Sequence, residues 1–186
     1  MHRFVVISGC SGGGKSALLE ELRRRGYAVV EEPGRRVVKV ELERQGAALP
    51  WVDAAAFAHR ILDMAMADRD DARALQGWVF FDRGLIDAAA ALEHATGEPA
   101  VAELGTAHRF HTRVFLAPPW PEIYETDSER QHDFGTATDE YLRLLDAYAR
   151  LGYETTILPK IAVTARADFV LDSLGASNAN PACLPS

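Results

Sequence analysis

A glycine-rich segment near the N-terminus constrains the fold more than any other part of the sequence. Residues 9–16 read GCSGGGKS, which fits the phosphate-loop pattern G-x-x-x-x-G-K-S. In this pattern the glycines let backbone N–H groups turn toward phosphates, Lys15 reaches the β and γ phosphates, and Ser16 coordinates Mg²⁺. The segment predicts a nucleotide-binding loop between a strand and a helix, whose N-terminal dipole adds to the attraction for phosphate.

The residues on both sides of this segment have the pattern that a phosphate loop requires. Residues 4–8 form a continuous apolar run with β-branched side chains, which is typical of a buried parallel strand. Residues 15–25 carry leucines at helical spacing, and Gly26 is suited to end that helix. We therefore expect the nucleotide to contact the loop residues Gly9, Ser11, Gly12, Gly13, Gly14, Lys15, Ser16 and Ala17.

The rest of the chain repeats the alternation of strand and helix. The second strand is expected at 27–30, where the proline and glycine of the following EEPG segment end it. Hydrophobic patterning predicts further strands at 78–81, 113–116 and 155–158, and helices at 51–75, 85–94, 138–151 and 161–174. Such alternation favours right-handed crossovers. The sequence thus predicts an α/β fold, the P-loop NTPase three-layer sandwich with a five-stranded parallel sheet.

Length and composition are those of one globular domain. The chain has 186 residues, of which 48% are hydrophobic and 25% charged, close to the averages for such domains. We expect residues 1–174 to form a single P-loop domain with a lid at about 118–135. Residues 175–186 are rich in Ser, Asn and Pro and are expected to form a flexible tail.

Charge and hydropathy restrict the partners. A formal net charge of -7 argues against an extended nucleic-acid surface, which needs a basic face, and leaves a small molecule as the expected partner. No apolar run approaches the roughly 20 residues needed to cross a bilayer, and no cationic leader precedes the first strand. We therefore expect no membrane insertion and a cytoplasmic location.

Charged residues follow the second and third expected strands, where ligands of parallel sheets bind. Asp82 closes an apolar strand as a Walker B carboxylate does, so it is expected to hold Mg²⁺, and Arg83 to grip an anionic or hydroxyl-bearing substrate. Glu31 and Glu32 alternate, so one of them points toward the cleft and can accept a proton from a hydroxyl. The sequence does not decide which.

Arg35, one helical turn beyond these glutamates, is expected to line the same cleft. Asp87 is expected there as a further substrate-binding residue.

Three segments together resemble the NadR/Ttd14-like family of AAA-type P-loop proteins. These segments are the phosphate loop, Glu-Glu-Pro-Gly-Arg after the second strand, and Phe-Phe-Asp-Arg-Gly after the third. The family includes ribosylnicotinamide kinase domains, and its layout is similar to nucleoside and nucleotide kinases. The resemblance implies phosphoryl transfer, with Lys15 and Ser16 on phosphate and Mg²⁺, Asp82 on the metal or as base, and Arg83 on the substrate. It places Arg130 where a kinase lid supplies a transition-state arginine.

Two functions agree with these features. The first is an ATP-dependent small-molecule kinase that uses ATP and Mg²⁺ to phosphorylate a hydroxyl of a nucleoside-like or other small acceptor, with Glu31, Glu32 or Asp82 as the base. The alternative is a regulatory or binding protein that hydrolyses ATP or GTP slowly. The alternative is favoured by the acidic residues of the lid, which are Glu122, Glu125, Asp127, Glu129 and Asp133. An N-K-x-D segment does not occur, so adenine is the expected base.

Overall fold

A five-stranded parallel sheet forms the middle layer of the structure, a computed structural model that describes residues 3–124 and 134–176. Its strands are β1 (Phe4–Gly9), β2 (Ala28–Val30), β3 (Val79–Asp82), β4 (Arg113–Ala117) and β5 (Glu154–Ile157). Their order in the sheet is β2-β3-β1-β4-β5, and every neighbouring pair is parallel. The predicted fold class is confirmed.

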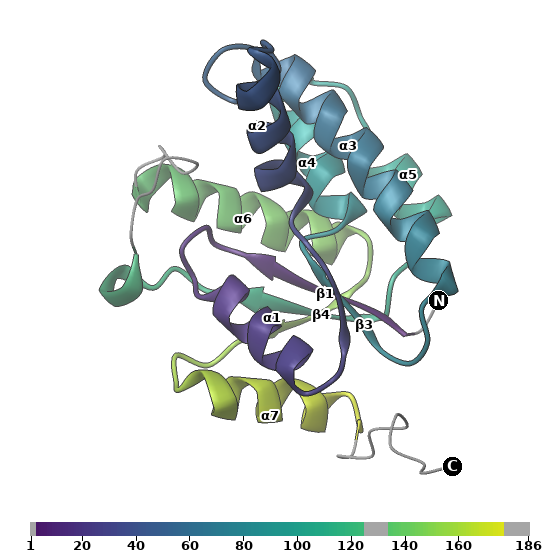
Figure 1. Ribbon diagram of the computed structural model, residues 1–186, viewed down its shortest axis with the longest axis vertical. Helices are drawn as coiled ribbons and strands as arrows, with labels where there is room; N and C mark the ends of the chain where they lie inside the picture. Colours follow the sequence, from purple (N-terminus) through teal and green to yellow (C-terminus); the bar gives the residue numbers. More distant parts are fainter. Residues whose placement is uncertain (1–2, 125–133, 177–186) are drawn as a thin grey trace.

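Helices cover both faces of this sheet (Figure 1). They are α1 (Lys15–Arg24), α2 (Pro33–Arg44), α3 (Ala54–Asp71), α4 (Leu85–Thr96), α5 (Val101–Ala107), α6 (Phe134–Arg150) and α7 (Val163–Ser173), with short 3-10 turns at Ala72–Ala74 and Pro121–Ile123. One face carries α1 and α7, and the other carries α3, α4, α5 and α6 (Figure 1). These faces bury two separate hydrophobic clusters, which makes three layers.

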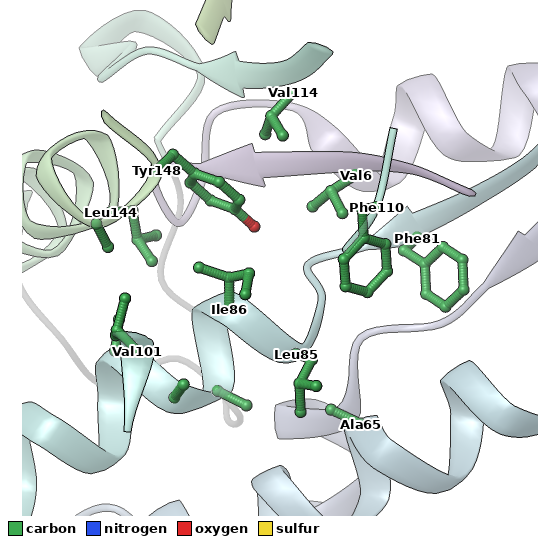
Figure 2. Packing of buried hydrophobic residues seen from close by; sticks show 14 of the residues in the cluster. Val6, Ala65, Phe81, Leu85, Ile86, Val101, Phe110, Val114, Leu144 and Tyr148 are labelled. Atoms are coloured by element: carbon green, nitrogen blue, oxygen red, sulfur yellow. The ribbon is translucent and has the colours of Figure 1, made fainter. Parts of the chain in front are cut away.

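The larger cluster fixes α4 and α6 over the sheet. Leu85 and Ile86 begin α4 and are fully buried, and they lie among side chains of β1, β3 and α6 (Figure 2). Tyr148 of α6 is also fully buried and points into this cluster (Figure 2). Because such interiors are close-packed, the spacing between α4 and α6 is held firmly.

The register of β1 brings two predicted site segments together. Ile7 of β1 pairs with Asp82 of β3, and Gly9 at the end of β1 pairs with Ala117 of β4. In a parallel sheet the carboxyl ends of the strands meet at one edge. Asp82 therefore lies beside the start of the phosphate loop.

Two helices were not expected from the sequence. The 12-residue helix α2 begins at Pro33, which sequence analysis treated only as the end of a strand. A proline suits the first position of a helix because its fixed φ is helical and its missing N–H has no partner there in any case. The seven-residue helix α5 is too short to show a clear hydrophobic period.

Replacement of a central core side chain tests the two-cluster arrangement. Phe80 is fully buried in β3, and its ring stands edge-on to Tyr27 with centroids 5.5 Å apart. We expect Phe80→Ala to lower the free energy of unfolding by about 3–5 kcal/mol, because it removes buried surface and leaves a cavity. Urea unfolding measures this loss. Leu142→Ala, at an α6 position that is 54% exposed, is the control and should cost less than about 1 kcal/mol; equal losses would contradict the packing.

Candidate active site

Glycine is required at both ends of the phosphate loop. Gly9 has φ +107°, and a Cβ at this position would lie 2.4 Å from the backbone oxygen of Ala117. Gly14 has φ +75° and is the residue that caps the start of α1. Side chains are disfavoured in this left-handed region, so the loop conformation depends on these two glycines. The residues between them run directly into the N-terminus of α1.

Lys15 lies inside the loop. Its side chain is buried, and the Nζ atom donates a hydrogen bond of 2.8 Å to the Cys10 carbonyl. Burial lowers the pKa of Lys15, and the nearby guanidinium of Arg83 lowers it further, against the opposing effect of Asp82. The amino group is therefore held at the centre of the loop, where an anion would relieve an unfavourable environment.

Arg166 of α7 supports the loop from behind, a role that sequence analysis missed. Its Nη1 and Nη2 atoms donate to the carbonyls of Gly14 and Gly13, each at 3.2 Å. In a trans peptide the N–H points away from the C=O. Arg166 therefore fixes the N–H groups of Gly14 and Lys15 toward the opposite side of the loop. Burial lowers the pKa of Arg166, and its guanidinium lies 5.6 Å from the ring centroid of Trp120.

Asp82 has a buried carboxylate group, and one of its oxygen atoms accepts no hydrogen bond from the described residues. It is 7% exposed, and its Oδ1 atom has no hydrogen-bond partner among the described residues. Burial raises the pKa of Asp82 to about 7, and repulsion by Glu32 adds to this effect. A cation beside Oδ1 would satisfy this oxygen. The observation fits the predicted role of Asp82 as a Mg²⁺ ligand.

The two glutamates after β2 point in different directions. Glu32 has Oε1 at 3.2 Å from Arg83 Nε and Oε2 at 3.4 Å from Arg35 Nε. The side chain of Glu31 is 68% exposed and lies 3.4 Å from Arg23. Only Glu32 therefore reaches the charged cluster beside the loop, a choice that the sequence left open.

Arg83 forms ion pairs with two glutamates, Glu140 on α6 and Glu32 just before α2. Its Nη1 and Nη2 atoms each donate at 2.9 Å to the carboxylate of Glu140 on α6, and its φ is +63°, an uncommon value for a residue other than glycine. Burial alone would lower the pKa of Arg83, but Glu140 and Glu32 outweigh it and raise the pKa. Although burial opposes the ionised form of Glu140, Arg83 lowers the pKa of that carboxyl. Glu140 sits in an ordinary amphipathic helix, so nothing in the sequence marked it.

Asp87 serves an internal network. It accepts hydrogen bonds from the Ser8 hydroxyl, from Tyr148 Oη at 2.6 Å and from the Gly84 N–H at 2.9 Å. Burial and the carboxylate of Asp87 raise the pKa of Tyr148 well above its usual range. Asp87 thus ties β1, α4 and α6 together at the floor of the site. The partners of Asp87 cannot be read from sequence spacing.

A cleft adjoins the loop on the side of these charged residues. Its polar lining consists of Ser11, Glu32, Arg35, Arg83, Asp87 and Glu140, and its apolar lining includes Val38, Phe57 and Ile61. Ser11 belongs to the phosphate loop, so the loop and the cleft share a wall. A ligand in the cleft would lie next to phosphates bound in the loop.

A metal ion bound here would take some of its ligands from the nucleotide. Ser16 is exposed at the start of α1, and no group of three or more His, Cys, Asp or Glu side chains in residues 3–124 and 134–176 could hold a metal. Oxygen ligands suit Mg²⁺, which usually keeps water and phosphate oxygens around it. Ser16 and Asp82 would supply the protein ligands. Ala17, next to Ser16 in the first turn of α1, is also exposed.

One predicted catalytic residue, Arg130, lies outside the described residues, as does much of the predicted lid. Its role as a transition-state arginine stays a prediction. Within the described parts of the chain, every helix is too short or too polar to span a bilayer.

Known proteins share this architecture. The family model described as "AAA domain" matches residues 4–166, whereas no curated protein sequence matches the chain. A solved structure of NadR protein in complex with NR superposes with a TM-score of 0.71 at 18% identity and covers 93% of this chain and 52% of that chain. The chain thus spans about half the length of that protein.

Two solved kinases are matched over nearly their whole length. A deoxyadenosine kinase from M. mycoides with bound dATP has a TM-score of 0.56 at 13% identity and covers 92% of this chain and 99% of that chain. A thymidylate kinase from Ehrlichia chaffeensis has a TM-score of 0.59 at 14% identity and covers 92% of this chain and 97% of that chain. At these identities the likeness is one of fold.

The buried carboxylate of Asp82 predicts a pH-dependent stability. Its pKa is near its ordinary value of 3.8 in the unfolded chain and about 7 in the folded protein. Between these values the folded state holds a proton that the unfolded state has released, so stability falls as pH rises through this range. We expect Asp82→Asn to stabilise the ligand-free protein at pH 8 by up to a few kcal/mol, since a pKa difference of one is worth about 1.4 kcal/mol.

Thermal unfolding at pH 4.5 and pH 8 measures this effect, and the stabilisation should be small at the lower pH. Asp63→Asn, at an exposed position of α3, is the control and should change little at either pH. A destabilisation by Asp82→Asn at pH 8 would contradict the environment described for this carboxylate.

Proposed function

The chain belongs to the AAA domain family, and from this premise we propose that it is an ATP-dependent kinase of a small hydroxyl-bearing acceptor. The observation that carries the proposal is the shared wall between the phosphate loop and the cleft. Ser11 belongs to both, and Glu32 lines the cleft while its charge acts on Asp82 and on Lys15. A phosphoryl donor and an acceptor would thus lie next to each other.

The donor side rests on the loop. The N–H groups of Gly14 and Lys15, oriented by Arg166, and the Lys15 ammonium would bind the nucleotide phosphates. Ser16 and Asp82 would hold Mg²⁺, which when bound neutralises charge on the phosphates. The cation would then stabilise the ionised form of Asp82 and offset the cost of burying that charge.

The acceptor side rests on Glu32. Its carboxylate lies at the cleft between Arg83 and Arg35, which hold it at 3.2 Å and 3.4 Å. Glu32 would accept the proton of the acceptor hydroxyl as that oxygen bonds to the γ phosphorus and ADP leaves. We assign the base to Glu32 because Glu31 is exposed elsewhere and Asp82 is committed to the metal.

The lining of the cleft supports a nucleoside-like acceptor. Phe57, Ile61 and Val38 provide an apolar wall for a flat ring, while Glu32 and Arg35 meet hydroxyl groups. The matched structures point in the same direction, because one binds NR and another is a deoxyadenosine kinase. In this proposal Arg130 closes on the transferred phosphoryl group, as the sequence predicts.

The direct experiment supplies an acceptor. Protein, Mg-ATP and a panel of nucleosides and sugars are incubated, and mass spectrometry detects an added phosphate. We expect Glu32→Gln to lower kcat for phosphorylation about 10²- to 10⁴-fold, the usual contribution of a general base. Glu31→Gln is the matched control from the neighbouring position and should leave kcat unchanged. ADP release without any phosphorylated acceptor would overturn the kinase and favour a slow regulatory NTPase.

The loop lysine provides a separate test of the donor site. We expect Lys15→Ala to abolish measurable Mg-ATP binding in calorimetry, because the buried ammonium is the main charge inside the loop. Circular dichroism should show a folded protein. Lys39→Ala, at an exposed position of α2, should bind Mg-ATP as the parent does. Tight binding by Lys15→Ala would mean that the nucleotide binds elsewhere.

A further inference from the structure

The cleft continues into a second compartment that the proposed reaction does not use. This compartment lies between α4 and α6 and is closed at one side by the start of α3. It shares Ser11, Asp87 and Glu140 with the first cleft. A molecule whose hydroxyl faces Glu32 would therefore extend into it.

Alanine side chains line much of the second compartment. Ala90, Ala91 and Ala95 of α4 line one wall, and Ala137 of α6 lines the facing wall. The wall along α4 runs from Asp87 to His94, which is about 10 Å at the rise of an α-helix. The alanine-rich sequence of α4 thus leaves a space that larger side chains would fill.

The second compartment is also lined by a guanidinium, that of Arg143. The carboxylates of the compartment already have hydrogen-bond partners, because Glu140 accepts from Arg83 and Asp87 accepts from three donors. The charge of Arg143 also lowers the pKa of Glu140, although Arg83 has the larger effect. Arg143 lies on α6, and His94 of α4 also lines the compartment. Arg143 is half-buried and forms no hydrogen bond and no ion pair within 4 Å with any residue in the described parts of the chain.

Arg143 differs in this respect from the other arginines of the site. Arg83 is paired with Glu140, and Arg35 with Glu32. A half-buried guanidinium with open donors is a strong partner for a carboxylate, which it can bind through two parallel hydrogen bonds. A single arginine matches the charge of one carboxylate.

We propose that the second compartment binds a carboxylate on the acceptor, with Arg143 as its partner and the acceptor hydroxyl at Glu32. This inference rests on the proposed function, since it names the acceptor class of the same cleft. The acceptor would be an acidic, ring-bearing molecule whose hydroxyl and carboxylate lie at opposite ends. Arg143 then determines specificity and takes no part in the transfer itself.

The test measures binding, so it does not depend on turnover. Two matched pairs of ligands serve as probes, uridine with 5-carboxyuridine and nicotinamide riboside with nicotinate riboside, each titrated into the full chain by calorimetry with a non-hydrolysable ATP analogue. We expect the carboxylated member to bind about 10- to 100-fold more tightly in at least one pair, the range of a charge-assisted hydrogen bond. Uridine 5′-monophosphate is included as a phosphate-bearing probe.

Variants separate Arg143 from a general charge effect. Arg143→Gln should remove the preference for the carboxylate and change the affinity for the ATP analogue and the neutral ligand less than about twofold, while Arg143→Lys should keep part of the preference. Arg150→Gln, at a position of α6 that pairs with Asp146 and Glu93, is the control and should keep all of it.

Equal affinity within both pairs, including no binding of either member, would overturn the proposal, as would a preference that survives in Arg143→Gln. Tighter binding of the monophosphate than of both carboxylates would overturn the assignment of the carboxylate. If the parent protein showed no preference for the carboxylate but phosphorylated neutral acceptors, this inference would be rejected and the proposed kinase activity would stand. If the carboxylated ligand bound more tightly but was not phosphorylated, the carboxylate site would stand and the proposed kinase activity would be rejected.

Discussion

The parallel pairing of β1 with β3 is the constraint on which the site depends. It sets Ile7 against Asp82, so the phosphate loop and a buried carboxylate leave the same edge of the sheet side by side. Removed from solvent, Asp82 has a pKa of about 7 and Lys15 has a lowered pKa. Both charged forms are costly without a ligand. A bound cation would stabilise ionised Asp82, and a bound phosphate would stabilise the Lys15 ammonium.

A second group of interactions holds the residues of the cleft in place. Arg83 joins Glu32 at the start of α2 to Glu140 on α6, and Asp87 joins Ser8 of β1 to Tyr148 of α6. Removing one member of such a network leaves a buried charge unpaired, which is costly. The network therefore gives the cleft a fixed width while its own charges remain balanced. Arg143 acts on this network only through its charge, which lowers the pKa of Glu140, and we propose above that its guanidinium binds a ligand.

The phosphate loop and the cleft differ in how they are built. The loop is local, because its glycines, Lys15 and Ser16 lie within eight consecutive residues. It is supported by distant residues, among them Arg166 of α7 and the backbone oxygen of Ala117. The cleft is assembled from four helices that span more than 100 residues of the chain, α2, α3, α4 and α6.

The sequence by itself determined the fold class, the loop and the position of Asp82, because each depends on short-range patterns: apolar runs, glycines and a charged residue at a strand end. It failed on α2, where Pro33 suited a strand end and a helix start equally, and it left Glu31 and Glu32 undecided. Only the tertiary structure shows that Glu32 contacts Arg83, that Glu140 pairs with Arg83, that Arg166 binds the loop and that Arg143 lines the second compartment. Glu32, Glu140 and Arg166 contact residues that lie more than 50 positions away in the chain. No periodicity or spacing along the sequence records which partner a side chain meets after packing.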